Sequence, residues 1–379
     1  MSGRTLVVTN DFPPRVGGIE SFVLEMVRLL PPDQVVVHTA RQPGDREFDA
    51  TLPFPVVRDP SRIMLPTPAI TRRAVAIARE HGCDRVWFGA AAPLGLMAAT
   101  LRRRAGVVRT VATTHGHEVW WAMLPGARRL LRRIGETNDV LTYLGEFTRA
   151  RVARALTPAA RARMVRLTPG VDVELFHPGV DGRPVRQRYG LGDRPVVVCV
   201  ARMVRRKGQD TLIKALPLVQ RSVPEAMLLL VGDGPDRKRL MRLARRAGVE
   251  QDVVFAGAHP WRELPPFFAA GDVFCMPCRT RKFGLEAEGL GIVFLEAAAS
   301  GLPVIAGNSG GAPDTVIDGA NGLVVREAGG AALTNLLLAV LAAPATATSM
   351  SARGRDWAFD WQWTLRAEQL CQLLSATEC

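Results

Sequence analysis

The chain has 379 residues, of which 47% are hydrophobic, which suits two or more domains with cores of their own. Its net charge of +13 favours acidic partners: nucleotide diphosphates, anionic lipids or nucleic acids. The absence of a long apolar run or a signal-like start, together with only six cysteines, argues against a membrane span or a disulfide scaffold, so we expect a cytoplasmic protein.

The first part of the chain alternates short apolar runs with segments of helical periodicity. Residues 4–9 form a β-branched run, and apolar residues at helical spacing predict a helix over 19–30. Further strands are expected at 35–38, 85–88, 108–113, 139–143 and 163–167, and helices at about 69–81, 93–104 and 147–155. This alternation indicates a parallel sheet with crossover helices.

A second alternating series follows the Pro- and Gly-containing stretch 168–179, which marks a domain boundary. Strands are expected at 195–201, 226–231, 252–255, 272–275 and 303–306, and helices at about 208–221, 235–247, 262–270 and 290–300. The tail 356–375 carries Trp357, Trp361 and Trp363 in an amphipathic stretch. We expect a C-terminal helix that docks on the other domain.

Two glycine-containing strand-to-helix turns carry residues suited to anions. Gly17 and Gly18 precede the first helix, where glycine allows close approach to a ligand and the helix N-terminus favours an anion. Gly232 lies in the turn "GDGP", where Asp233 would cap the next helix in the plainer interpretation. Tight turns without a ligand remain the alternative for both.

Two cations follow the strand at 195–201. Arg202 and Lys207 stand at its carboxyl end, where α/β sheets bind ligands, and an Arg fork with a Lys charge suits a diphosphate. Arg205 and Arg206 are expected to face solvent. A solvated basic loop is the alternative.

The stretch "EGLGIVFLE" places Glu288 before a Gly-Leu-Gly turn and Glu296 inside an apolar helix. The free N–H groups of residues 289–291 suit a phosphate or a sugar hydroxyl. Glu288 can accept hydrogen bonds from a sugar, and Glu296 from a ribose. Capping and surface carboxylates are the alternative, which fits Glu296 poorly because an unpartnered charge in an apolar run is costly.

Four motifs in order, GGIE, Arg202…Lys207-Gly, GDGP and the E-x7-E of Glu288 and Glu296 followed by SGLPVIA, resemble the retaining glycosyltransferases of family 4. This resemblance implies an α/β protein of the GT-B fold, with two Rossmann-like domains whose parallel sheets face a central cleft. It implies an acceptor-binding domain over 1–168, joined by a tail over about 360–379 that crosses back, and a nucleotide-sugar-binding domain over 175–355.

The resemblance also implies roles for individual residues. The implied catalytic residues are His115, Arg202, Lys207 and Glu288. The implied donor-binding residues are Gly17, Gly18, Arg202, Lys207, Gly232, Gly257, Ala258, Glu288, Gly289, Leu290, Gly291, Ile292, Val293 and Glu296. In this family a histidine at the end of the strand before "HGHE" touches the donor sugar. His115, which is nearest that strand, is favoured over His117, and a packed histidine is the alternative.

"NDFPPRVGGIE", "THGHEVWW" and the Glu288 segment look most like actinobacterial GDP-mannose-dependent mannosyltransferases that act on phosphatidyl-myo-inositol monomannoside. The implied partners are GDP-mannose, an anionic glycolipid acceptor and the inner leaflet surface, without nucleic acid. The implied acceptor-binding residues are Asp11, Arg58, Arg62, Met64 and His117. Stretches 58–73 and 124–136 join arginines to apolar residues, as peripheral membrane binding requires, although a helix with a solvated arginine face is the alternative.

The implied reaction is mannosyl transfer with retention, in which the leaving diphosphate takes the acceptor proton and the domains close about 168–179. No carboxylate pair has glycosidase spacing and no Asp-x-Asp motif is present, so we expect no metal or cofactor. A UDP-sugar remains open as the donor, because the sequence does not show which nucleotide base the backbone near 257–259 selects. A glucuronosyl diacylglycerol, a soluble sugar or a natural product remains open as the acceptor. A non-catalytic nucleotide- or nucleic-acid-binding protein is a further alternative. The charges of 279–287 depart from the commoner E-P-F-G form.

Overall fold

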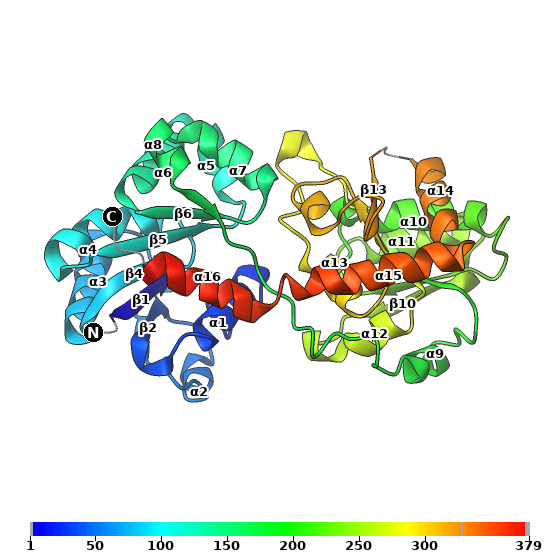
Figure 1. Ribbon diagram of the computed structural model, residues 1–379, viewed down its shortest axis with the longest axis horizontal. Coiled ribbons are helices and arrows are strands. Elements are labelled where there is room, and N and C mark those ends of the chain that lie inside the picture. The colour runs from blue at the N-terminus through cyan, green and yellow to red at the C-terminus, as the bar shows by residue number, and fades with distance from the viewer. Residues whose placement is uncertain (1–2, 327–328, 376–379) are drawn as a thin grey trace. The chain divides into compact units, whose positions relative to one another are not determined.

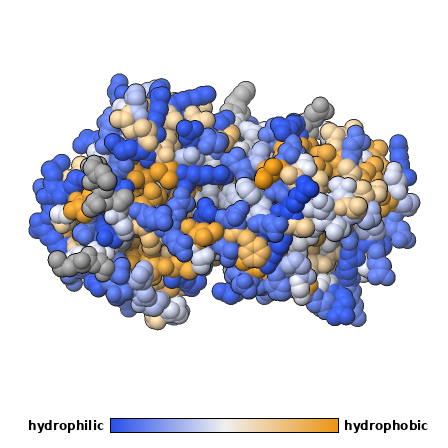
Figure 2. Space-filling view, in the orientation of Figure 1, coloured by the Kyte–Doolittle hydropathy of each residue, from blue (hydrophilic) through white to orange (hydrophobic). Residues whose placement is uncertain are grey.

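The computed structural model describes residues 3–326 and 329–375 (Figure 1). The chain divides into two compact units, one made of Met1–Pro169 with Trp363–Cys379 and the other of Gly170–Gln362. Hydrophilic residues cover most of the visible surface of each unit, as the 49 lysines and arginines lead one to expect (Figure 2).

Unit 1 is built on a seven-stranded parallel sheet in the order β3-β2-β1-β4-β5-β6-β7. Its strands are β1 Arg4–Thr9, β2 Val35–Ala40, β3 Val56–Asp59, β4 Cys83–Phe88, β5 Arg109–Thr114, β6 Val140–Tyr143 and β7 Met164–Arg166. Leu6 and Val8 belong to one hydrophobic core and Val7 to the other, because successive side chains of a strand point to opposite faces. A core on each face explains why these strands read as continuous apolar runs.

Helices cover both faces of this sheet. They are α1 Gly18–Arg28, α2 Asp45–Asp49, α3 Pro68–Glu80, α4 Ala98–Ala105, α5 Glu118–Met123, α6 Pro125–Thr137, α7 Glu146–Val152, α8 Pro158–Ala162 and α16 Trp363–Ser375. The last of these packs against α1, β4 and β5, although it comes from the other end of the chain (Figure 1).

Unit 2 contains a six-stranded parallel sheet in the order β10-β9-β8-β11-β12-β13. Its strands are β8 Val196–Val200, β9 Met227–Val231, β10 Val253–Gly257, β11 Val273–Met276, β12 Val304–Gly307 and β13 Gly322–Val325. Its helices are α9 Arg183–Arg188, α10 Gln209–Val219, α11 Arg237–Arg246, α12 Pro265–Ala269, α13 Ile292–Ala299, α14 Gly330–Leu341 and α15 Pro344–Phe359.

In both sheets the strand order reverses beside the first strand, between β1 and β4 and between β8 and β11. Open α/β sheets bind ligands at the carboxyl ends of the strands that flank such a reversal. The loops after these strands are therefore where functional side chains are to be sought.

The structure confirms the predicted alternation and adds strands and helices that the periodicity did not indicate, β3, β13, α14 and α15 among them. The expected C-terminal helix that docks on the other domain is present as α16, although the amphipathic stretch 356–375 is not one continuous helix. The chain breaks between Phe359 and Trp363, so that Trp357 and Trp361 pack on each other in unit 2, whereas Trp363 packs near Phe22 in unit 1.

Among the described residues, no single helix is long and apolar enough to cross a bilayer. The pair α14 and α15 passes such a test only when taken together, and it is bent by 91°.

Candidate active site

The loop after β8 brings Lys207 to Glu288. Arg205–Lys207 form a single 3-10 turn, and Gly208 follows it with φ of 82°, a backbone that glycine adopts without strain. The Nζ atom of Lys207 lies 2.8 Å from Oε2 of Glu288, with both side chains largely buried. Two residues 81 positions apart, each predicted from its own motif, thus form one charged pair.

Arg202 and Arg206, in the same loop as Lys207, have different environments. Arg202 is exposed, and no ion pair or side-chain hydrogen bond of it is found within residues 3–326 and 329–375. Arg206 was expected to face solvent, but its Nε lies 3.9 Å from Oε2 of Glu288. Arg206 is therefore only partly exposed to solvent, with its Nε close to Glu288, whereas Arg202 retains its full donor set for a ligand.

A turn after β12 fixes the backbone of Glu288. The Glu288 N–H donates to the Ser309 hydroxyl at 3.3 Å, and the Gly311 N–H donates to the Glu288 carbonyl at 3.0 Å. Gly310, at φ of 58°, lies so close that a Cβ there would collide with the Glu288 carbonyl oxygen. Ser309, Gly310 and Gly311 were not predicted as site residues, although Ser-Gly-Gly directly after a buried strand was an available signal.

Helix α13 begins directly behind this turn. Gly291 is its N-cap at φ of 84°, with no side-chain cap, and no acidic residue stands in its first turn. The N–H groups around Ile292 and Val293 therefore lack an intrahelical partner and sit at the positive end of the helix dipole. This arrangement can bind a phosphate or an anionic leaving group.

Glu296 lies one turn into α13 and is 4% exposed. Its Oε1 accepts a hydrogen bond of 2.7 Å from the indole Nε1 of Trp261. Burial raises the pKa of Glu296 to about 7, and the Trp261 hydrogen bond opposes that rise. The sequence predicted an unusual carboxylate at Glu296. It did not predict the contact with Trp261, because no motif links these two residues, which are 35 positions apart.

The remaining donor-site candidates meet where β9 and β10 end. The Gly232 N–H donates to the Gly257 carbonyl at 2.7 Å, so the GDGP turn and the segment at Gly257 and Ala258 are adjacent. Asp233 does not cap the next helix as expected, because its Oδ1 accepts from the Gly234 N–H and α11 begins only at Arg237.

The unusual charges before Glu288 pair with one another. Glu286 lies 3.1 Å from Arg281 and 2.5 Å from Lys282. Cys275 and Cys278, of the stretch "CMPC" that precedes this loop, are buried in the hydrophobic core of unit 2.

In unit 1 the loop after β1 forms an acidic and basic cluster. Arg15 bridges Asp11, at 2.8 Å, and the buried Glu20, which stands in the first turn of α1. Burial and the nearby Glu20 raise the pKa of Asp11. Gly17 has the extended backbone of an N-cap, and a Cβ there would collide with the Glu20 carboxylate.

The HGHE loop after β5 is held by Glu118, which sequence reasoning did not select. Its Oε2 accepts from the backbone N–H groups of His115 and Gly116 at 3.0 and 3.2 Å, and its Oε1 lies 3.1 Å from Nε2 of His117. His115 contacts the Gly89 carbonyl through Nε2 at 2.6 Å, and burial lowers its pKa. An acid at the start of a helix, following two histidines, was the available signal.

Two of the residues implied to bind the acceptor, Arg58 and Met64, make structural contacts within unit 1. Arg58 donates twice to Asp49, at 2.9 and 2.7 Å, and once each to the carbonyls of Ala40 and Pro13, which leaves its guanidinium little capacity for a phosphate. Met64 is fully buried. The sequence around these residues is basic and was expected to be exposed. Such a pattern does not distinguish an arginine that is hydrogen-bonded to its own domain from one that is available to a ligand.

Arg62 differs from both, because it is exposed and has no ion pair within the described part of the chain. It stays a candidate for the acceptor phosphate.

Two parallel-sheet domains, one of them with a Lys–Glu pair and an uncapped helix N-terminus at its strand ends, match the GT-B arrangement that the motifs led us to expect. Solved structures agree in fold. The Anabaena protein HepE in complex with UDP has a TM-score of 0.82 at 20% identity and covers 99% of this chain and 100% of its own. Sucrose-phosphate synthase from Thermosynechococcus elongatus has a TM-score of 0.77 at 24% identity and covers 98% of both.

Sequence comparison identifies the family. "Glycosyltransferase Family 4" matches residues 16–181, and "Glycosyl transferases group 1" matches residues 183–357. The chain is 51% identical, over 98% of both sequences, to the GDP-mannose-dependent alpha-(1-6)-phosphatidylinositol monomannoside mannosyltransferase of Mycolicibacterium smegmatis. It is 45% identical, over 99% of this chain and 98% of the other, to the enzyme of Corynebacterium glutamicum named for the monoacylated acceptor. The chain belongs to glycosyltransferase family 4, and the resemblance drawn from its motifs is confirmed.

Proposed function

We propose that this protein is a retaining α-mannosyltransferase that moves mannose from GDP-mannose to phosphatidyl-myo-inositol monomannoside, giving the dimannoside. The names of the full-length relatives support this donor and acceptor. The observation that carries the chemistry is the buried Lys207–Glu288 pair in front of the uncapped α13. Family membership disfavours the non-catalytic alternatives, and the choice of donor and acceptor is what the experiment must decide.

The donor would be held at the strand ends of unit 2. Lys207, exposed Arg202 and the first N–H groups of α13 neutralise the diphosphate as the sugar–phosphate bond breaks. Glu288 accepts hydrogen bonds from the sugar while Lys207 holds its carboxylate in place. Glu296 accepts hydrogen bonds from the ribose hydroxyls.

The acceptor hydroxyl then attacks from the face that the diphosphate leaves, and the leaving phosphate oxygen takes the acceptor proton. Positioning and charge neutralisation by the protein provide the rate enhancement, so we propose that no metal is required. His115 is proposed to contact the donor sugar, whereas Asp11, Arg62 and His117 are proposed to face the acceptor.

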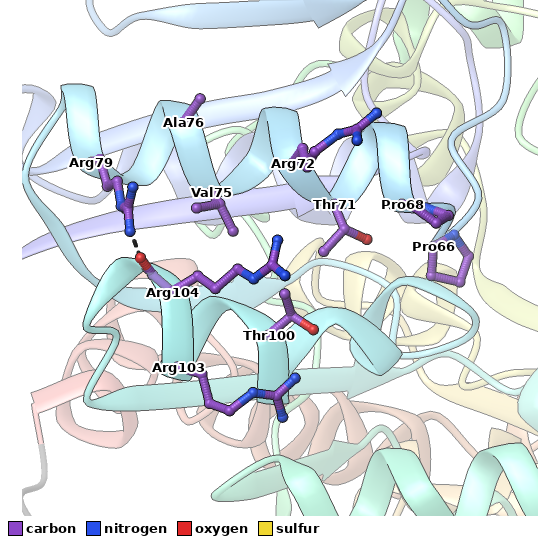
Figure 3. A pocket seen from close by; sticks show the side chains of 10 residues that line it. All are labelled: Pro66, Pro68, Thr71, Arg72, Val75, Ala76, Arg79, Thr100, Arg103 and Arg104. Carbon is purple, nitrogen blue, oxygen red and sulfur yellow. Dashed lines mark hydrogen bonds between the residues drawn. The ribbon is translucent and has the colours of Figure 1, made fainter.

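A groove between α3 and α4 supports a role at the anionic inner leaflet (Figure 3). It has a volume of about 690 Å³, and its walls carry Arg72, Arg79, Arg103 and Arg104 without an acidic side chain. In the figure the Arg104 side chain runs between the two helices, and Arg79 donates to its backbone carbonyl at 2.8 Å. Such a groove favours phosphate-bearing headgroups.

The loop that leads into α3 adds apolar anchors. Ile63 and Leu65 are 68% and 51% exposed, and Asn10 pins the residue between them, Met64, through both of its backbone groups at 2.7 and 2.9 Å. The loop thus presents two apolar side chains from a fixed backbone, as peripheral membrane proteins do. We propose that the protein acts in the cytoplasm, bound peripherally to the plasma membrane.

A transfer assay with purified protein tests the proposal. GDP-mannose, UDP-glucose and UDP-N-acetylglucosamine would each be offered with phosphatidylinositol monomannoside. We expect dimannoside from GDP-mannose alone, with α-configured product. Transfer from a UDP-sugar would contradict the donor, and bound nucleotide without transfer to this lipid would contradict the acceptor.

Membrane binding is tested separately by sedimentation with vesicles. We expect binding to vesicles that contain phosphatidylinositol and little binding to neutral phosphatidylcholine. The double variant Arg103→Ala, Arg104→Ala should weaken it, whereas Arg245→Ala, at an exposed arginine of α11, should not. Equal binding to both vesicle types would contradict the membrane proposal.

A further inference from the structure

The ionisation of the Glu296 carboxylate depends on one neighbouring side chain, that of Trp261. Burial is the larger cause of its raised pKa, and the hydrogen bond from Trp261 is the only opposing cause. The flanking α13 residues Phe294, Leu295 and Ala297 are buried and apolar. The Trp261 indole therefore provides the polar contact that makes an ionised carboxylate tolerable in this helix.

Charged groups on surrounding elements do not take this role. None of them is among the causes of the Glu296 pKa shift. These groups are Arg353, Arg355 and Asp356 on α15, Asp314 in the short turn before β13, and His259, Arg262 and Glu263 around Trp261.

Aromatic packing against the core of unit 2 holds the Trp261 side chain in place. It opens the 3-10 turn Trp261–Glu263 after β10, and its ring lies 5.6 Å from that of the fully buried Phe176. Phe176 in turn packs at 5.6 Å against Phe268 in the core of the unit. The indole is nevertheless 38% exposed, so its ring is fixed on one side while its N–H is directed at Oε1 of Glu296.

We propose that Trp261 is a positioning residue of the donor site, whose indole N–H holds one oxygen of Glu296 so that the carboxylate is presented to the 2′- and 3′-hydroxyls of the nucleotide ribose. This inference rests on the proposed function, which assigns Glu296 to the ribose. A carboxylate fixed at one oxygen cannot rotate away, so less conformational freedom is lost when the diol binds.

Proton release on nucleotide binding follows from this arrangement. An ionised carboxylate is the best acceptor for hydrogen bonds from two hydroxyl groups, and these hydrogen bonds in turn favour the ionised state. Near pH 7 a share of Glu296 is protonated, and this share loses its proton when GDP binds. Removing the indole N–H takes away support for the ionised form, so the pH at which GDP affinity reaches its plateau should rise.

The test measures GDP affinity by calorimetry between pH 5.5 and 8.5 for the full-length protein and for Trp261→Phe, which keeps an aromatic ring. The lost hydrogen bond both orients the carboxylate and favours its ionised form, so we expect GDP affinity near pH 7 to fall about tenfold. The affinity curve should also move to higher pH. Binding of 2′,3′-dideoxy-GDP should be the same in both proteins, which also shows that the variant is folded.

Trp357→Phe is the matched control. Its indole N–H donates to the Thr315 carbonyl at 2.9 Å in the same unit, so the same atoms are removed without touching Glu296. We expect wild-type affinity and pH dependence from this control.

Three results would overturn the inference, and they are distinguishable. If Glu296→Gln weakens GDP but Trp261→Phe binds GDP like the wild type, Glu296 needs no positioning by the indole. If Glu296→Gln binds GDP as well as the wild type does, the ribose assignment fails and the role of Trp261 fails with it. An equal loss for GDP and dideoxy-GDP in Trp261→Phe would show a structural defect and would also contradict the proposal.

Discussion

The candidate sites of the two units differ in how far local sequence determines them. In unit 2, Lys207 and Glu288 were each predicted from a strand–loop–helix motif, and they contact each other directly. In unit 1, Arg58 and Met64 were selected from a basic and apolar stretch, and there Arg58 is bonded to Asp49 and Met64 is fully buried. Diphosphate and sugar recognition needs specific residues at fixed turns, whereas surface composition is compatible with many packing arrangements.

The largest effect is expected from breaking the unit 2 pair. Lys207→Ala removes the cation that is proposed to face the leaving diphosphate, and it leaves Glu288 buried without its ion-pair partner at 2.8 Å. We expect kcat for mannosyl transfer to fall by about 10²- to 10³-fold, as for other lost charge-stabilising donors. Steady-state kinetics with GDP-mannose measures this, and Lys214→Ala, at an exposed lysine of α10, is the control.

A loss of less than about fivefold in Lys207→Ala, with normal folding, would contradict the role given to this pair. It would also remove the contrast between the units, because the predicted residues of unit 2 would then be structural as well.

The next prediction addresses unit 1 through stability. Arg58→Ala abolishes four hydrogen bonds and leaves Asp49 without its ion pair, so we expect the free energy of unfolding to fall by about 3 kcal/mol. Urea denaturation measures it. Arg62→Ala, four positions along, should change stability by less than about 0.5 kcal/mol while raising the KM for the lipid acceptor.

The opposite pattern would restore the original prediction. If Arg58→Ala unfolds like the wild type and only the acceptor KM rises, Arg58 is a binding residue despite its bonds to Asp49.

How much of the site the sequence predicts depends on what each residue contacts. Gly291 and Glu288 follow from the chemistry of one turn, so their positions were predictable. Trp261 reaches Glu296 only because folding brings the 3-10 turn after β10 to α13, and nothing in the spacing of these residues indicates this contact.

The same limit applies to the fold. Buried parallel strands such as β8 are visible as apolar runs. The division of the C-terminal tail between two units depends on where Trp361 and Trp363 find partners, and periodicity alone does not show this.

A smaller effect is expected from Glu296 on the pH dependence of stability. Its pKa is about 7 in the folded chain and 4.5 ordinarily, so between these values the folded chain holds a proton that the unfolded chain has released. Stability therefore falls as pH rises from about 4.5 to 7, by up to roughly 3 kcal/mol. Glu296→Gln should flatten this part of the curve, measured by urea denaturation at several pH values.

Glu225→Gln, at an exposed carboxylate of the same unit, should leave the slope unchanged. An unaltered slope in Glu296→Gln would mean that the carboxylate is ionised throughout this range, and that the indole and its surroundings stabilise the charge more than burial opposes it.

The smallest effect is expected from removing divalent metals. If Lys207, Arg202 and the N–H groups of α13 neutralise the departing diphosphate, a metal ion would duplicate charge that the protein already supplies. Transfer in excess EDTA should therefore stay within about twofold of the untreated rate, and added Mg²⁺ should not increase it. A large loss restored by Mg²⁺ would show that the cations of unit 2 are insufficient alone. It would also make Lys207→Ala a sharper experiment, because metal would then be expected to rescue part of its lost activity.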